Sequence, residues 1–234
     1  MRLAVAGRSL LVLDLDGTLA PIVADPDMAR LRESTRQLLV KVAGRYPTVV
    51  LTGRDRRAAA RILRGVPLRM IIGNHGLDLG GSRAAKTVTA WVRQLRAQRG
   101  VLKDVLIERK HLSIAADYRG SADRAGARRR ALRVAAALVP APRVIPGKGS
   151  VNLIPNIGID KGTTLRQLLK RFRAQNAVFV GDDATDETAF VAARGSNVLT
   201  VRVGTSSDTA AKFALASQLQ IDALLRRLLQ ARLR

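Results

Sequence analysis

Two carboxylates at the end of an apolar run are the first residues in this chain that could do chemistry. Leu10–Leu13 is a run of strand-forming residues, and Asp14 and Asp16 follow it before a Gly17-Thr18 pair that has to turn the backbone. A carboxylate is costly to bury unless it is paired or bound to a cation. The pattern predicts a metal site in the crevice where open parallel sheets bind ligands, although Asp and Gly are also common in solvated turns.

A second acidic group has the same relation to an apolar run. Ala177–Val180 leads through Gly181 into Asp182, Asp183 and Asp186. The chain has no cysteine, so any metal here is held by oxygen, and clustered oxygen ligands suit Mg²⁺. We therefore expect both acidic groups to meet at one edge of a sheet.

A hydroxyl and a lysine complete this set of residues. Thr52 follows the apolar run 48–51, and Lys161 begins a predicted helix that would face the same edge. A carboxylate can attack phosphorus only if its repulsion by the phosphate dianion is relieved. A cation, a lysine and a hydroxyl donor could together relieve it, which makes Asp14 a candidate nucleophile.

The elements that must position these residues alternate between strand and helix outside the middle of the chain. The expected strands are 10–13, 48–51, 70–72, 177–180 and 195–201. The expected helices are 34–44, 56–63, 161–172 and one or two over 208–233. This order predicts an α/β fold with a parallel sheet.

The middle of the chain follows a different order, helix–strand–strand–helix–strand–strand. The expected helices are 87–98 and 121–138, and the expected strands are 103–108, 112–116, 143–145 and 150–154. Because this is not a parallel-sheet pattern, it predicts a separate α+β module. We expect a discontinuous core of residues 1–80 and 156–234 with an inserted domain of residues 81–155.

Length and composition are those of a globular protein. The chain has 234 residues, 47% of them hydrophobic, and no apolar run approaches the length of a membrane-spanning helix. Arg2 and Arg8 precede an apolar run, but Asp14 and Asp16 interrupt it, so we expect a core strand and no signal peptide. The absence of cysteine fits a reducing compartment, and we expect a cytoplasmic protein without a membrane partner.

The net charge of +23 attracts phosphate-bearing partners of any size. Only 3% of residues are aromatic, so base-stacking platforms are scarce, and Arg128–Arg130 is the one run of arginines. The simpler interpretation is a set of solvated arginine-rich faces. We do not expect nucleic acid to be the main partner.

The motifs resemble those of the haloacid dehalogenase superfamily of phosphatases, which has DxDGT, a strand-terminal Ser or Thr, a Lys and GDD or GDxxxD in this order. The resemblance implies a Rossmannoid parallel-sheet core with a smaller inserted α+β cap domain. It implies that Asp14 forms an aspartyl-phosphate, that Asp16 is the general acid and base, and that Thr52 and Lys161 bind phosphate. It further implies that Asp182 holds Mg²⁺ with Asp14 and the Asp16 carbonyl, while Asp183 and Asp186 complete or orient that shell.

Within this superfamily the chain is similar to the trehalose-6-phosphate phosphatases. The similar stretches are LDLDGTLAPI at 13–22, LTGR at 51–54, GNHG at 73–76, GIDKGTTL at 158–165 and GDDATDE at 181–187. The resemblance implies a sugar phosphate as the small-molecule substrate. The substrate-binding residues that it implies are Gly53, Arg54, Asn74, His75, Glu108, Lys110, Arg119, Lys148 and Asn152.

Two positions depart from that family's pattern. Asn152 stands where the family has Glu in a Val-Glu-Val strand, and Asp117 stands where it has the His of His-Tyr-Arg. We expect a monomeric phosphatase of trehalose 6-phosphate. One alternative is a phosphatase of a related sugar phosphate, and another is a basic binding protein that kept the fold and lost turnover.

Overall fold

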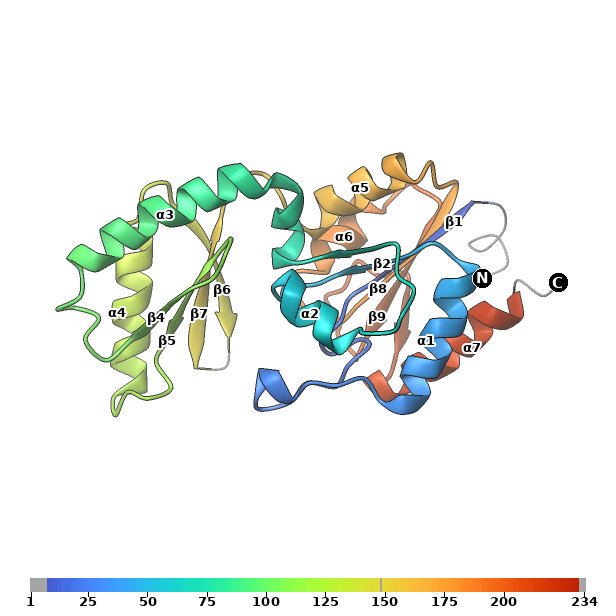
Figure 1. Cartoon of the computed structure of the whole chain (residues 1–234), viewed down its shortest axis with the longest axis horizontal. Coiled ribbons are helices and arrows are strands. Elements are labelled where there is room, and N and C mark those ends of the chain that lie inside the picture. Colours follow the sequence, from blue (N-terminus) through green and yellow to red (C-terminus); the bar gives the residue numbers. More distant parts are fainter. Residues whose placement is uncertain (1–7, 148, 232–234) are drawn as a thin grey trace. The chain divides into compact units, whose positions relative to one another are not determined.

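Two separate sheets organise the chain in this computed structural model, which describes residues 8–147 and 149–231. The first compact unit combines the residues up to Gly76 with those from Ile159 onward, and the second is Leu77–Gly158 (Figure 1). The second unit therefore interrupts the first in sequence. None of the helices in the described ranges is long and apolar enough to cross a bilayer.

The first unit is built on a six-stranded sheet in the order β10-β9-β8-β1-β2-β3, and each neighbouring pair is parallel. The strands are β1 (Ser9–Leu13), β2 (Thr48–Leu51), β3 (Met70–Ile72), β8 (Asn176–Gly181), β9 (Val198–Val203) and β10 (Phe213–Leu215). β1 lies in the interior of the sheet between β8 and β2. Its residues form an uninterrupted buried run, as expected for a strand covered on both faces.

Helices cover both faces of this sheet (Figure 1). They are α1 (Glu33–Arg45), α2 (Arg56–Ile62), α5 (Lys161–Arg171), α6 (Glu187–Ala192) and α7 (Ile221–Ala231). Successive β1 side chains point to opposite faces. Leu11 and Leu13 therefore pack in the core with α1, α2 and α7, whereas Leu10 and Val12 pack in the core with α5 and α6.

The second unit is a four-stranded antiparallel sheet in the order β4-β5-β7-β6, with two helices. The strands are β4 (Leu106–Arg109), β5 (Ile114–Asp117), β6 (Pro142–Gly147) and β7 (Ser150–Pro155), and the helices are α3 (Gly81–Ala97) and α4 (Arg124–Ala136). Trp91 of α3 and Val134 of α4 pack with Ile114 and Leu153 of the sheet. This unit thus has its own hydrophobic core.

The predicted fold class is confirmed: a parallel α/β core and a separate α+β unit with the expected order of elements. The expected helices over 208–233 are partly wrong. Phe213–Leu215 is an edge strand, and helix α7 begins only at Ile221. Residues 232 and 233 lie outside the described ranges.

Several expected boundaries are displaced. The strand expected at 195–201 begins at Val198, because Gly195 adopts a positive φ of 72° in a turn. The helix expected from 87 begins at Gly81, and the strand expected from 103 begins at Leu106. None of these shifts moves a residue expected in the site off its element.

Candidate active site

The carboxyl ends of neighbouring parallel strands bring the two acidic groups together. Leu13 of β1 is in register with Val180 of β8, and the Asp14 N–H donates to the Val180 carbonyl at 2.9 Å. Asp14 therefore leaves the end of β1 beside the loop that begins at Asp182. Asp14 is 4% exposed, so its carboxylate is almost fully removed from water.

Lys161 is the positive charge at the centre of this acidic group. Its Nζ donates to Asp14 Oδ1 at 2.9 Å and to Asp186 Oδ1 at 2.7 Å, while the residue is 1% exposed. Burial opposes the charged form, but the charges of Asp14 and Asp186 outweigh it and raise the pKa of Lys161 above its ordinary value. Lys161 is therefore a permanent ammonium between two acids.

The start of α5 fixes the position of Lys161. Asp160 is the N-cap residue, and its carboxylate accepts from the Thr163 N–H at 2.7 Å. The Thr163 hydroxyl in turn accepts from the Asp160 N–H at 2.9 Å, which completes a capping box. Lys161 is the first residue of the helix and is therefore held by a rigid backbone.

Three carboxylates are close enough to share a cation. One oxygen each from Asp14, Asp182 and Asp186 lies within 4.8 Å of the others. Asp186, however, is already fully engaged, because Oδ1 binds Lys161 and Oδ2 accepts the N–H groups of Asp182 and Asp183 at 3.0 Å each. Asp186 thus orients the loop, whereas Asp14 and Asp182 keep oxygens available for a metal.

The pKa values of Asp14 and Asp182 are raised first by burial and then by the charges of neighbouring carboxylates. Burial raises the pKa of Asp14 to about 7, against the opposing effect of Lys161. Burial, together with the charges of Asp186 and Asp183, raises the pKa of Asp182 to about 6. A hard divalent cation would relieve this repulsion, and an all-oxygen donor set fits Mg²⁺.

Asp183 behaves differently from its neighbours. Partial burial opposes its ionisation, but the Lys161 charge and the Thr185 hydrogen bond outweigh that effect and lower the pKa of Asp183 to about 2. Its Oδ1 lies 4.0 Å from Lys161 Nζ and accepts from the Thr185 hydroxyl at 2.7 Å. Asp183 is therefore an ionised member of the loop.

Gly17 and Thr18 belong to the site, although only the carboxylates of their motif were expected to act. Gly17 has a φ of +79°, and a Cβ atom there would lie 2.0 Å from Asp182 Oδ2. Thr18 donates from its hydroxyl to Asp182 Oδ1 at 3.2 Å. The DxDGT motif contains both residues, so the signal for their role was present in the sequence.

Arg54 holds the second carboxylate of the motif. Its Nε donates to Asp16 Oδ2 and its Nη2 donates to Asp16 Oδ1, both at 2.6 Å, in a bidentate ion pair. Its Nη1 donates to the Pro26 carbonyl at 2.7 Å. The structure thus brings together two residues that were expected to have separate roles, Arg54 in substrate binding and Asp16 in proton transfer.

The loops after β2 and β3 are joined to each other. The Thr52 carbonyl accepts from the His75 N–H at 2.9 Å, and the Arg54 carbonyl accepts from the Asn74 N–H at 2.8 Å. A Cβ atom on Gly53 would lie 2.4 Å from His75 Cε1, so a larger residue there would displace the His75 ring. The Thr52 hydroxyl accepts from the Arg54 N–H at 3.1 Å and can still donate its own hydrogen.

The remaining expected residues belong to the second unit. Strand register places Glu108 of β4 opposite Ala115, and Ala115 opposite Asn152 of β7, so Glu108 and Asn152 share one row across the sheet. Arg119 is exposed, and its Nε and Nη2 both donate to Oδ2 of Asp117. Lys110 follows β4, and Lys148 lies outside the described residues.

Solved structures define the class of protein to which this fold belongs. The chain is similar to a haloacid dehalogenase-like hydrolase from Bacteroides thetaiotaomicron, with a TM-score of 0.62 over 95% of this chain and all of that one, at 16% identity. A trehalose-6-phosphate phosphatase related protein superposes with a TM-score of 0.75 and 26% identity over 96% of this chain and 98% of that one. The fold is therefore haloacid dehalogenase-like.

The family follows from the sequence as well. A model of the trehalose-phosphatase family matches residues 12–218, and the chain belongs to that family. It is 36% identical to the trehalose-phosphate phosphatase of Mycobacterium avium over 91% of this chain and 60% of the relative. It is 34% identical to that of Mycobacterium tuberculosis strain H37Rv over 98% of this chain and 64% of the relative. The chain thus spans less than two thirds of the length of these relatives.

Proposed function

We propose that this protein is a Mg²⁺-dependent phosphatase that hydrolyses trehalose 6-phosphate to trehalose and inorganic phosphate. The observation that carries the proposal is the buried Lys161 bridge between Asp14 and Asp186, at the edge of the sheet where β1 and β8 end. Membership of the trehalose-phosphatase family and similarity to the mycobacterial phosphatases support the choice of substrate.

The first step is attack of Asp14 on phosphorus. Lys161 donates to Oδ1 of Asp14 and holds the carboxylate in place for the attack. A bond forms between a carboxylate oxygen of Asp14 and phosphorus, the bond between phosphorus and the sugar oxygen breaks, and Asp16 gives its proton to the departing sugar. The product of this step is an aspartyl-phosphate on Asp14.

The second step returns the enzyme to its starting state. Asp16 takes a proton from water, whose oxygen attacks phosphorus and breaks the bond to Asp14. Both Asp16 oxygens are bound by Arg54 in the structure, so Asp16 can carry a proton only when at least one of these hydrogen bonds opens. Arg54 therefore positions the carboxylate form of Asp16, which exists between the two proton transfers.

Asp14, Asp182 and the Asp16 backbone carbonyl would hold Mg²⁺, and Asp183 and Asp186 would orient them. When bound, the cation offsets the negative charge that otherwise keeps a carboxylate from a phosphate dianion. Thr52 and Lys161 would bind the phosphate oxygens. This assignment is supported by the 4.8 Å acidic cluster and by the raised pKa values of Asp14 and Asp182.

The second unit would act as the cap that recognises the sugar. Glu108, Lys110, Arg119, Lys148 and Asn152 are the proposed contacts, and Gly53, Arg54, Asn74 and His75 would contact substrate from the core. The shared row of Glu108 and Asn152 supports a common binding face. Asn152 in place of a glutamate keeps open a second candidate function, hydrolysis of a related sugar phosphate.

We further propose that the protein is a cytoplasmic monomer without a nucleic-acid partner. The alternative of a different class is a catalytically silent basic protein.

A panel of sugar phosphates, tested with Mg²⁺ or with chelator, distinguishes the trehalose 6-phosphate phosphatase, the phosphatase of a related sugar phosphate and the silent protein. The measurement is the amount of phosphate released. Trehalose 6-phosphate should react fastest, and only with Mg²⁺. Faster phosphate release from another sugar phosphate favours the second candidate function. If the native protein released no more phosphate from any ester than the Asp14→Asn variant does, the protein would be catalytically silent.

A further inference from the structure

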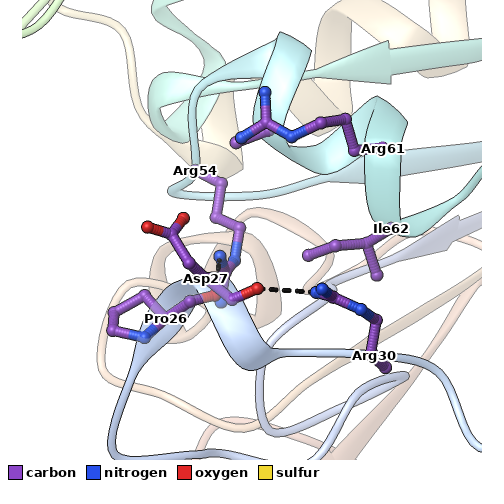
Figure 2. A pocket seen from close by; sticks show the side chains of 7 residues that line it. Pro26, Asp27, Arg30, Arg54, Arg61 and Ile62 are labelled. Atoms are coloured by element: carbon purple, nitrogen blue, oxygen red, sulfur yellow. Dashed lines mark hydrogen bonds between the residues drawn. The ribbon is translucent and has the colours of Figure 1, made fainter.

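A basic pocket in the first unit is lined in part by Arg54, the residue that binds Asp16. It has a volume of about 410 Å³ and is lined by Pro26, Asp27, Arg30, Arg54, Ala58, Arg61 and Ile62. Figure 2 shows the side chains of Arg30, Arg54 and Arg61 around it, contributed by the segment after β1, the loop after β2 and helix α2. Pockets of this size take small ligands.

The charge around the pocket is positive. Three guanidinium groups and the carboxylate of Asp27 line it, and Asp16 already pairs with Arg54, so three positive charges minus two negative charges leave one. The surrounding segment 54–64 contains Arg54, Arg56, Arg57, Arg61 and Arg64 against a single acid, Asp55. Like charges gathered at this density repel one another, and a bound dianion would relieve the repulsion.

Two of the arginines are held in place and still have donors to offer. Arg30 Nη1 donates to the Asp27 carbonyl at 2.6 Å (Figure 2). It also donates to the Ala29 carbonyl at 2.8 Å. Arg54 uses one N–H each on Nε, Nη1 and Nη2 for Asp16 and Pro26. A guanidinium carries five N–H groups, so two remain on Arg54 and three on Arg30.

The third arginine has no internal role to explain it. Within the described ranges the Arg61 guanidinium makes no hydrogen bond or ion pair, and this exposed residue lines the pocket. Planar guanidinium groups match the geometry of phosphate oxygens. We propose that this pocket binds a small dianionic oxyanion of the phosphate type, through Arg30, Arg54 and Arg61, at a site separate from Asp14 and Lys161.

Arg54 links this site to the acid–base residue. The same guanidinium that would contact the anion from the pocket clamps both oxygens of Asp16. Any shift of Arg54 toward a bound anion therefore weakens its hold on Asp16. The pocket is thus an anion site whose occupancy bears on the position of a residue in the proposed catalytic centre.

Calorimetric titration of the whole chain with inorganic phosphate tests the inference, with Mg²⁺ present and sulfate as a second arm. We expect two phosphate sites in the native protein. Lys161→Met should remove the one at the catalytic centre. The double variant Arg30→Gln with Arg61→Gln should weaken the other by about tenfold or more, because charge-assisted hydrogen bonds are lost.

Two further variants guard against a non-specific effect of charge. Arg57→Gln removes the same charge from an exposed residue of the same helix that does not line the pocket, and it should bind as the native protein does. Asp27→Asn removes the one acid of the lining and should tighten binding severalfold. Sulfate binding at the pocket would identify a general dianion site, and binding of phosphate alone would identify a phosphate site.

The outcomes separate this inference from the proposed function. The native protein could show a single phosphate site that survives Lys161→Met and is lost in the double variant. That result supports binding in the pocket and counts against phosphate binding at the proposed catalytic centre. One site that is lost only in Lys161→Met overturns the pocket. Equal weakening by Arg57→Gln and by the double variant also overturns it, because a diffuse charge effect would then account for binding.

Discussion

Lys161 Nζ lies 2.9 Å from Asp14 Oδ1 and is also bound to Asp186, so one buried ammonium compensates two buried carboxylates. Uncompensated charges are costly in such a place, and the rise in the pKa of Asp14 to about 7, caused first by burial, shows that compensation is incomplete. A cation bound by these acids would supply counter-charge that Lys161 alone does not.

Replacing this lysine should harm both stability and turnover. Lys161→Met leaves Asp14 and Asp186 without their counter-charge, which for a broken buried pair costs about 3–5 kcal/mol. The Tm of thermal unfolding and the rate of phosphate release should both fall sharply. Lys170→Met, an exposed lysine of the same helix, is the matched control and should change neither. Native-like stability of Lys161→Met would contradict the bridging role.

Removing the nucleophile should abolish turnover without unfolding the protein. Asp14→Asn keeps the size of the side chain but removes the attacking charge, so kcat should fall by about three decades or more. Asp208→Asn, an exposed acid, serves as the control. Retention of more than about a tenth of native activity would mean that water attacks phosphorus directly.

The metal-free protein should lose stability as pH rises. The native pKa of Asp14 is about 7 and that of Asp182 about 6, against an ordinary 3.8. The native state therefore binds more protons than the unfolded state between about pH 4 and 7, and the free energy of unfolding falls across this window. Thermal unfolding in chelator at pH 5 and pH 7.5 measures the effect.

Mg²⁺ should reverse that loss, because it binds the ionised carboxylates. The rise in Tm on adding Mg²⁺ should be larger at pH 7.5 than at pH 5, and Asp14→Asn should flatten the pH dependence. A Tm in chelator that rises steadily from pH 5 to pH 7.5 would show that these acids do not dominate the stability of the metal-free protein.

Asn152 offers a test of sugar recognition. A hydrogen bond to a charged acceptor contributes about 1.5 to 3 kcal/mol, against about 1 for a neutral one. Asn152→Glu should therefore raise kcat/KM for trehalose 6-phosphate severalfold and leave a small aryl phosphate unchanged. A poor reaction of trehalose 6-phosphate with both proteins, beside a good reaction of another sugar phosphate, would assign Asn152 to a different specificity.

Two glycines separate backbone strain from crowding at the site. Gly17 and Gly195 have φ values of +79° and +72°, but only at Gly17 would a Cβ atom meet Asp182. Gly195→Ala should cost about 1–2 kcal/mol of stability with full activity. Gly17→Ala should cost at least as much and should also lose turnover, because Asp182 has to move. Equal activities of the two variants would place Asp182 outside the chemistry.

The positions of the acids could be predicted because each follows directly on a buried strand. Asp14 and Asp182 take their place from β1 and β8, and parallel pairing brings the two strand ends to one edge. The short strand Phe213–Leu215 was not predictable in the same way. Three residues at the sheet edge give too short a pattern to distinguish from the leucine-rich helix that follows.

Pairings between side chains from different loops were also beyond the sequence. Arg54 and Asp16 lie 38 positions apart, and nothing in their spacing shows that both Asp16 oxygens bind one guanidinium. Likewise, three aspartates in one loop look equivalent, although only Asp186 is fully buried and fully hydrogen-bonded. Such roles depend on loop conformation, which propensity and periodicity do not encode.

The interior place of β1 in the sheet has a consequence for biosynthesis. Its partner β8 ends at Gly181, so a ribosome must make most of the chain before the first strand can find that neighbour. The second unit, Leu77–Gly158, is complete in sequence before β8 begins at Asn176, and it has its own core. Because domains fold as units during synthesis, we expect the second unit to fold before the C-terminal part of the first unit has been made. The N-terminal part of the first unit then still lacks β8.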